Sequence, residues 1–179
     1  MQRRRTWIAG GIAVAAAGLG ALWSARRHAS AEGGAAPAPA PADFWSARFT
    51  DLQGGELALA SLRGRPLVLN FWATWCPPCV KEMPELDRFS ASQGAAGWQV
   101  LGVAIDQAAA VRGFLDKTPV RFPVALAGDQ GLHWVNALGN LAGGLPFTVV
   151  FDARGDVIHR KLGPTSHDEL TGWAAARPA

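Results

Sequence analysis

Cysteine is scarce in this chain of 179 residues, which has only two, Cys76 and Cys79. With so few thiols, a framework of structural disulfides is excluded, and so is a zinc site built from four thiolates. Three of the four histidines, His133, His159 and His167, have no metal-ligand spacing relative to one another. The sequence therefore predicts neither a bound metal nor a cofactor.

Beyond the N-terminus the chain also lacks a surplus of positive charge. Five of the 17 Lys and Arg residues lie within residues 3–27, where there is no acidic residue. The rest of the chain contains the other 12 together with all 14 Asp and Glu residues. The net charge of +3 thus comes from the leader, and the rest of the chain is slightly acidic. A nucleic-acid partner has no electrostatic footprint here.

Both cysteines of the chain lie in one short segment, Trp75-Cys76-Pro77-Pro78-Cys79. Two intervening residues are the spacing at which a strand-to-helix turn lets one disulfide open and close, and a helix N-terminus favours the thiolate. We interpret the pair as a redox centre. The alternative, an inert local disulfide, is disfavoured because so short a loop gives little chain-entropy stabilisation.

The N-terminal residues 1–28 predict a membrane anchor. Three arginines precede an uncharged run over residues 6–25, which approaches the length of about 20 residues that a bilayer requires. The positive N-terminus would stay in the cytoplasm of a bacterial cell, with the catalytic domain in the periplasm. The alternative is a secretory signal cleaved after Ala31, and a twin-arginine export signal is a weaker one.

An Ala- and Pro-rich linker is predicted over residues 29–43, because this composition cannot bury a core and favours extended backbone. The remaining residues 44–179 have the length of one domain with a single core.

Hydrophobic periodicity in this domain predicts an α/β fold, with a mixed sheet covered by helices on both faces. The expected strands are a hairpin of 49–52 and 56–59, followed by 67–73, 98–105, 122–126, 147–152 and 157–162. The expected helices are 80–92 with a kink at Pro84, then 108–117, 129–138 and a last helix that begins at a capping box of Ser166 and Glu169.

The segment from Asn70 to Pro84, NFWATWCPPCVKEMP, resembles the active-site segment of the thioredoxin superfamily, and specifically of the membrane-anchored TlpA/ResA-like thiol-disulfide oxidoreductases. Leu145-Pro146 before a strand is similar to the cis-proline loop of that family. The resemblance implies a thioredoxin-like fold with an N-terminal β-hairpin and a central insertion. Two departures are Phe147, where many relatives have Thr, and Asn70, in place of the buried Asp of cytoplasmic thioredoxins.

The order of attack follows from the position of each sulfur. Cys76, at the exposed start of the helix, is expected to attack, and Cys79, one turn further in, to resolve the mixed disulfide. Pro77 and Pro78 remove two N–H donors that would stabilise the thiolate, which favours the disulfide and makes the centre a reductant.

Glu82 is the candidate base, because it follows Cys79 by three residues on the same helix face. The family resemblance points to the same residue. Burial beside a sulfur should raise the pKa of Glu82 above its ordinary value of about 4.3. The alternative is a solvated helix residue without a role.

Five residues are expected to contact substrate: Trp75, Pro77, Pro78, Leu145 and Pro146. Trp75 would shield Cys76, and Pro146, if cis, would bring its loop against the disulfide. The backbone of Leu145 could then pair with an extended substrate segment by β-addition.

These expectations together favour a periplasmic thiol-disulfide reductase. By analogy with the family, its clients would be apocytochrome c or a copper-site assembly factor, and a transmembrane thiol-reductant carrier would supply electrons. Alternatives are a copper-binding chaperone that uses the cysteine pair, and a disulfide oxidant or isomerase.

Overall fold

The computed structural model describes residues 37–94 and 97–176, all of which belong to a compact unit over Ala35–Ala179. A second unit, Met1–Gly34, contains the predicted anchor and lies outside the described residues. Within the described ranges, no helix is both long enough and apolar enough to cross a bilayer.

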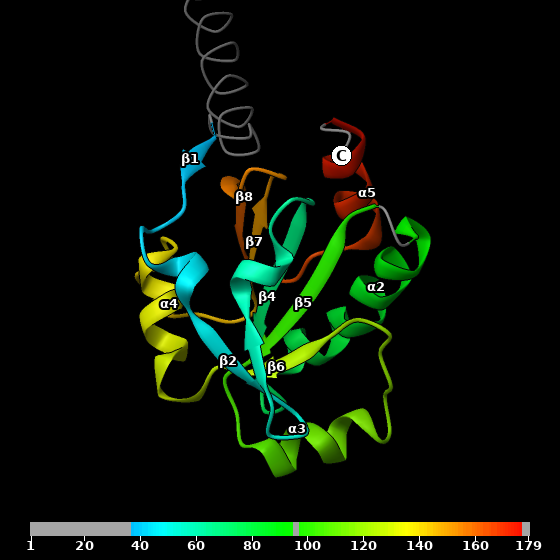
Figure 1. The fold of residues 1–179 in the computed structure, drawn as a ribbon. Helices are drawn as coiled ribbons and strands as arrows, with labels where there is room; N and C mark the ends of the chain where they lie inside the picture. Colours follow the sequence, from blue (N-terminus) through cyan, green and yellow to red (C-terminus); the bar gives the residue numbers. More distant parts are fainter. Residues whose placement is uncertain (1–36, 95–96, 177–179) are drawn as a thin grey trace, which may run out of the picture. The chain divides into compact units, whose positions relative to one another are not determined.

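One mixed sheet forms the centre of the unit, with strand order β1-β8-β7-β4-β5-β6-β2-β3 (Figure 1). The strands are β1 (Ala38–Pro39), β2 (Arg48–Asp51), β3 (Glu56–Ala58), β4 (Leu67–Trp72), β5 (Gln99–Ala104), β6 (Val124–Leu126), β7 (Phe147–Phe151) and β8 (Asp156–Leu162). The helices are α2 (Pro77–Gln93), α3 (Ala108–Leu115), α4 (Gly131–Ala137) and α5 (His167–Ala176), with short 3-10 turns at Phe44–Ser46, Leu59–Leu62 and Gly128–Gln130. Strands β4, β5 and β6 pair in parallel, and the other pairs are antiparallel.

Helices cover both faces of this sheet, as predicted. On one face Trp134 and Val135 of α4 join a buried cluster, and on the other Met83, Val111 and Leu170 bring α2, α3 and α5 into a second cluster. Figure 1 shows α4 on one side of the sheet, and α2 and α5 on the opposite side. The α/β fold expected from periodicity is therefore confirmed.

Strand β4 lies inside the sheet, and all six of its residues are buried. Side chains alternate between the faces of a strand, so Leu69 and Phe71 enter the cluster on the α4 face, whereas Val68 and Trp72 enter the cluster on the α2 face. Asn70 lies between the latter two and therefore directs its polar side chain toward α2, the helix that begins with the cysteines.

Helix α2 begins three residues earlier than predicted, at Pro77. Proline suits the first helical position because its missing N–H has no partner there in any case. The helix continues through Pro84, whose side chain is exposed. The predicted kink at Pro84 stays a prediction.

Two other elements begin two residues later than predicted. The strand expected over 122–126 is limited to Val124–Leu126, because Pro123 has no N–H to donate to a neighbouring strand. The helix expected over 129–138 starts as a 3-10 turn before α4. The capping box is confirmed, since Ser166 N donates to Glu169 Oε2 at 2.9 Å and Glu169 N to Ser166 Oγ at 3.3 Å.

The last part of the predicted linker contributes an edge strand. Ala38 lies opposite Val157 of β8, and Pro39 lies opposite Asp156. Proline is tolerated at a sheet edge, where its missing N–H breaks no internal ladder. The extended conformation expected for this segment is present, together with a partner strand that composition did not predict.

Candidate active site

The two cysteines lie at the start of α2, immediately beyond the end of β4. Cys76 is the N-cap residue, and a disulfide joins it to Cys79, with 5.3 Å between the two Cα atoms. Pro77 and Pro78 occupy the first two helical positions, so neither can donate to the Cys76 sulfur. Within the described chain, the N–H of Cys79 is the donor to Cys76 Sγ, at 3.4 Å.

Solvent exposure distinguishes the two sulfur-bearing residues. Cys76 retains 5% of its accessible surface, and Cys79 retains none. Pro77 is exposed and Pro78 half-buried, while Trp75, just before the cysteines, keeps 66% of its surface. A partner molecule can therefore approach Cys76 from the side of Trp75 and Pro77, whereas Cys79 is accessible only from within the protein.

The loop that carries Trp75 is fixed to the end of β5 by Asp106. Its Oδ2 accepts hydrogen bonds from Thr74 N at 2.9 Å and from Thr74 Oγ1 at 2.5 Å. Partial burial acts to raise the pKa of Asp106, but the bonds from Thr74 and from Gln107 N outweigh it and hold that pKa below its usual range. Asp106 is thus an ionised anchor for the segment that precedes Cys76.

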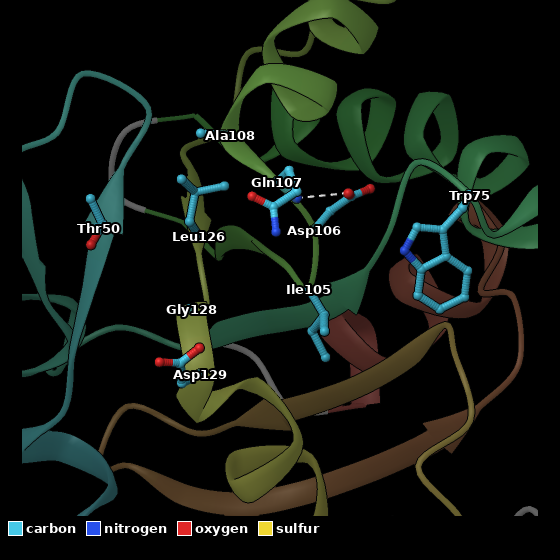
Figure 2. A pocket seen from close by; sticks show the side chains of 9 residues that line it. All are labelled: Thr50, Trp75, Ile105, Asp106, Gln107, Ala108, Leu126, Gly128 and Asp129. Carbon is cyan, nitrogen blue, oxygen red and sulfur yellow. Dashed lines mark hydrogen bonds between the residues drawn. The ribbon is translucent and has the colours of Figure 1, made fainter.

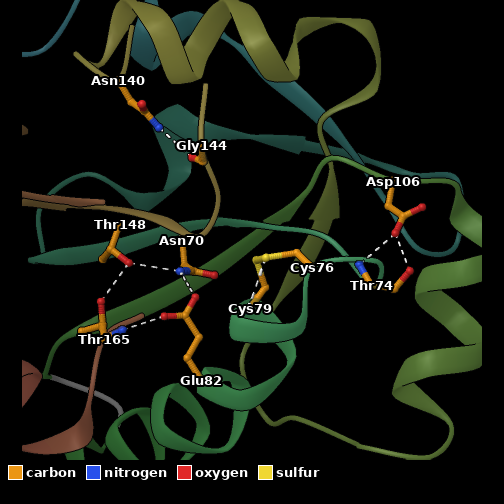
Figure 3. The surroundings of a disulfide bond; sticks show 10 residues. All are labelled: Asn70, Thr74, Cys76, Cys79, Glu82, Asp106, Asn140, Gly144, Thr148 and Thr165. Atoms are coloured by element: carbon orange, nitrogen blue, oxygen red, sulfur yellow. Dashed lines mark hydrogen bonds between the residues drawn. A yellow bond between two sulfur atoms is a disulfide. The ribbon is translucent and has the colours of Figure 1, made fainter. Parts of the chain in front are cut away.

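Glu82 is buried, with only 2% of its surface exposed, on the same face of α2 as Cys79. Its Oε1 accepts from Asn70 Nδ2 at 2.8 Å, and its Oε2 accepts from Thr165 N at 2.8 Å (Figure 3). The carboxyl group lies beside the redox centre and is hydrogen-bonded to Asn70 and Thr165 rather than to a sulfur. The solvated alternative does not describe its surroundings.

Burial raises the pKa of Glu82 to about 7. The hydrogen bonds from Thr165 and Asn70 and the charge of Lys161 act in the opposite direction, while the charge of Glu169 adds to the rise. Desolvation prevails because the ionised form loses more hydration than these groups replace. The predicted direction is confirmed, and Glu82 can exchange a proton near neutral pH.

A buried polar network extends from Glu82 across the sheet. Asn70 Nδ2 also donates to Thr148 Oγ1 at 3.0 Å, and Thr148 Oγ1 lies 3.2 Å from Thr165 Oγ1. Asn70 Oδ1 is different, because this buried oxygen has no hydrogen-bond partner among the described residues. The network joins β4, β7 and the segment before α5 beneath the cysteines.

The peptide bond between Leu145 and Pro146 is cis, as predicted. Neither the N–H nor the carbonyl of Leu145 forms a hydrogen bond within the described part of the chain. Asn140 supports this loop, because its Nδ2 donates to Gly144 O at 2.8 Å. Phe147 is buried and stacks on Phe71 with 6.2 Å between ring centroids, so it packs in the core.

Beside Trp75 lies a pocket of about 630 Å³ (Figure 2). Its apolar part is formed by Trp75, Ile105 and Leu126, and its polar part includes Asp106 and Asp129. Figure 2 shows the indole of Trp75 at one side of the pocket and Ile105 near its centre. The pocket is therefore continuous with the exposed side chain that precedes Cys76.

The described residues contain no group of three or more His, Cys, Asp or Glu that could hold a metal ion. Two of the histidines contact tryptophan rings: His133 packs against Trp134, and His159 stacks on Trp173.

Sequence reasoning missed Thr148, Thr165 and Asp106. Thr165 binds a residue 83 positions earlier in the chain, and no local pattern signals such a contact. For Asp106 a signal existed, since a polar residue just after a buried parallel strand lies at the edge where sites form in α/β proteins.

Comparison with known proteins agrees with this site. Residues 32–175 match the Redoxin family. Thiol-disulfide oxidoreductase ResA of Bacillus thuringiensis (strain Al Hakam) is 33% identical over 125 residues, which cover 69% of this chain and 70% of ResA. Among solved structures, a thioredoxin-related protein from Neisseria meningitidis serogroup B has a TM-score of 0.64 at 30% identity, covering 72% of this chain and 96% of that chain. A thiol:disulfide interchange protein from Chlorobium tepidum TLS has a TM-score of 0.66 at 28% identity, covering 80% and 98%.

A thioredoxin-like sheet with a dithiol at the start of its first long helix defines a thiol-disulfide oxidoreductase. The chain belongs to the Redoxin family, and the resemblance to ResA-like proteins is confirmed. Its activity is thiol-disulfide exchange at Cys76 and Cys79.

Proposed function

We propose that this protein is a reductase of disulfides in exported client proteins, held at the outer face of a bacterial inner membrane by its N-terminal segment. The proposed redox direction is supported by the small number of hydrogen-bond donors near the Cys76 sulfur. Within the described residues one backbone N–H, that of Cys79 at 3.4 Å, donates to the Cys76 sulfur, because prolines fill the two positions between the cysteines. A thiolate with few donors is poorly stabilised, so the disulfide is favoured and electrons pass readily to a client.

In the proposed cycle Cys76 attacks a client disulfide and forms a mixed disulfide, and the first client thiol is released. Cys79 then loses its proton, with Glu82 as the candidate base, and attacks Cys76 Sγ. The second client thiol leaves, so that one client disulfide is reduced while one disulfide forms in the enzyme. Exposure supports this order, because only Cys76 retains accessible surface.

The client segment would lie between Trp75 and the cis-proline loop. Trp75 offers a large exposed apolar surface at the edge of the pocket. On the other side, the backbone N–H and carbonyl of Leu145 have no partner in the described chain and would pair with an extended client backbone. Such pairing recognises backbone, so the client would be held with its disulfide over Cys76 whatever its side chains.

The clients proposed are the haem-binding thiols of apocytochrome c or the cysteines of a copper-site assembly factor. Exported compartments are oxidising, so a transmembrane thiol-reductant carrier would restore the dithiol. A copper-chaperone role for the cysteine pair would want a third ligand, and Met83, the nearest soft side chain in the sequence, is fully buried in the core. The alternative therefore gains no support.

The test is the midpoint potential of the Cys76/Cys79 couple, measured by equilibration with thiol buffers of known potential. We expect a value near that of thioredoxin, about −270 mV, and far from the value of about −120 mV for a strong oxidant. A potential above the middle of that interval would reverse the proposed direction and make the protein an oxidant or isomerase.

A further inference from the structure

Asn70 is fully buried, and in its side-chain amide the nitrogen forms hydrogen bonds whereas the oxygen forms none among the described residues. Nδ2 donates both to Glu82 Oε1 and to Thr148 Oγ1, at 2.8 and 3.0 Å. Oδ1 has no hydrogen-bond partner among the residues that the structure describes, although Asn70 exposes none of its surface. A buried carbonyl oxygen without a donor has lost its hydration without replacement, so such an atom is uncommon in a well-packed core.

The geometry places this oxygen on the side of the cysteines. Asn70 faces α2 from β4, and its Nδ2 contacts Glu82, which is one helical turn beyond Cys79 on the same buried face. The amide group therefore has Glu82 on one side and the start of α2 on the other. Figure 3 shows Oδ1 pointing toward the disulfide between Cys76 and Cys79, away from Thr148.

The disulfide form offers this oxygen no hydrogen to accept, because neither sulfur carries one. Reduction by a dithiol changes this situation. The S–S bond breaks, two electrons and two protons pass from the donor dithiol, the donor becomes a disulfide, and Cys76 and Cys79 each become a thiol. The Cys79 thiol is fully buried and is then a new donor in the space that Oδ1 faces.

We propose that Asn70 is a redox-specific positioning residue, whose Oδ1 accepts the S–H of Cys79 in the dithiol form and has no partner in the disulfide form. Through its other end, the same amide holds the Glu82 carboxyl, so that one side chain aligns the resolving thiol and the candidate base. The inference rests on the exchange chemistry at Cys76 and Cys79, and it does not depend on the proposed client or redox direction.

This arrangement stabilises the dithiol relative to the disulfide. The hydrogen bond exists in only one redox form, so its whole contribution enters the equilibrium between the two. It acts against the effect of Pro77 and Pro78, which favours the disulfide. For a net hydrogen-bond contribution of ordinary size, the dithiol-disulfide equilibrium constant would change about three- to tenfold.

The test compares midpoint potentials of the wild type, Asn70→Leu and Thr148→Val. Leucine has a similar volume and no acceptor, and we expect the equilibrium constant to move about three- to tenfold toward the disulfide. Thr148→Val removes the other partner of Nδ2 and leaves Oδ1 in place, so its potential should equal that of the wild type. An unchanged potential in Asn70→Leu, or an equal shift in Thr148→Val, would overturn the proposal.

Unfolding measurements on each redox form separate this role from a merely structural one. If Asn70 had only a structural role, Asn70→Leu would lower the free energy of unfolding of the dithiol and disulfide forms equally. The proposed role predicts a larger decrease for the dithiol form. The same potential shift should persist in a Glu82→Gln background. If it disappears there, Asn70 acts only through Glu82 and the inference fails.

A spectroscopic measurement needs no Asn70 variant. In Cys76→Ser the Cys79 thiol is the only S–H of the protein, and its infrared stretching band should lie at lower frequency than that of a free thiol. A band at the free-thiol frequency would show that no acceptor faces Cys79. A midpoint potential that contradicts the reductase function would leave this result unaffected, so the two proposals can fail independently.

Discussion

A carboxyl group is a base only when it is ionised, and Glu82 changes form close to neutral pH. Its pKa of about 7 results chiefly from burial, with Lys161 opposing the shift and Glu169 adding to it. At this pKa the carboxylate is abundant enough to accept a proton and basic enough to retain it, which is the condition for an efficient general base.

We therefore expect Glu82→Gln to slow the oxidation of the dithiol form by a disulfide substrate by about 10²-fold at high pH. In the wild type the rate should rise as pH passes through about 7, because Glu82 becomes ionised there, and this rise should be absent in the variant. Stopped-flow measurement of intrinsic tryptophan fluorescence between about pH 5 and 9 records both profiles. Superimposable profiles would mean that Glu82 accepts no proton from Cys79.

The difference in burial between the two sulfurs gives a second prediction at this scale. Cys79→Ser should accumulate a mixed disulfide between Cys76 and the client, since attack occurs and resolution cannot. Cys76→Ser, with its remaining thiol fully buried, should yield no adduct and is the matched control. Non-reducing electrophoresis with mass spectrometry identifies the adducts, and adducts from Cys76→Ser alone would reverse the assignment.

Among the elements, the loop before the cis peptide bond owes its shape to Asn140, a buried side chain that donates to Gly144 O. Asn140→Ala removes this bond without touching the cysteines. We expect KM for a disulfide substrate to increase several-fold and the midpoint potential to stay unchanged, because the loop would bind the client and has no part in the dithiol equilibrium.

The matched control is Asn136→Ala, the same change at an exposed position of α4. It should leave both KM and potential at their wild-type values. An Asn140→Ala enzyme with an unaltered KM would indicate that this loop does not contact the client.

Elements with a local pattern were predictable. The apolar run of β4, the hairpin of β2 and β3 and the capping box of Ser166 and Glu169 each follow from residues close together in sequence. Strand β1 was not predictable, since Ala38 and Pro39 have low strand propensity and depend on β8, far along the chain.

The candidate site likewise has residues that the sequence predicts and contacts that it does not. The cysteines, Glu82 and Pro146 stand in recognisable motifs, and the pKa direction of Glu82 follows from burial alone. The contacts of Thr148 and Thr165 depend on strand order and on where the chain enters α5. The unpartnered oxygen of Asn70 depends on the orientation of one amide, which no sequence pattern specifies.

For the whole molecule, the buried carboxyl of Glu82 links folding to pH. Its pKa is raised from 4.5 to about 7, so the folded form holds a proton that the unfolded chain releases over this interval. The resulting stabilisation is complete below about pH 4.5 and is lost as pH rises through about 7, with a total of up to about 3 kcal/mol.

We expect the free energy of unfolding of the disulfide form to fall between about pH 5 and 8, and this slope to be absent in Glu82→Gln. Carboxyls with lowered pKa act in the opposite sense, but their stabilisation is lost only at more acidic pH; these are Glu85, Asp87, Asp106, Asp152 and Glu169. Denaturant titrations across this range measure the slope. Parallel curves for the two proteins would mean that Glu82 titrates alike in the folded and unfolded chain.

The pairing of Ala38–Pro39 with β8 determines at which residue a shortened protein without the N-terminal segment should begin. A sheet edge with unpaired backbone groups is a template for the same edge of another molecule. A version that starts at Phe44 would leave Asp156 and Val157 of β8 without their partner strand and would favour edge-to-edge dimers that could be mistaken for a native quaternary structure. A version that starts at Ala35, where the compact unit begins, keeps Asp156 and Val157 paired with β1 and is the form in which the state of association should be measured.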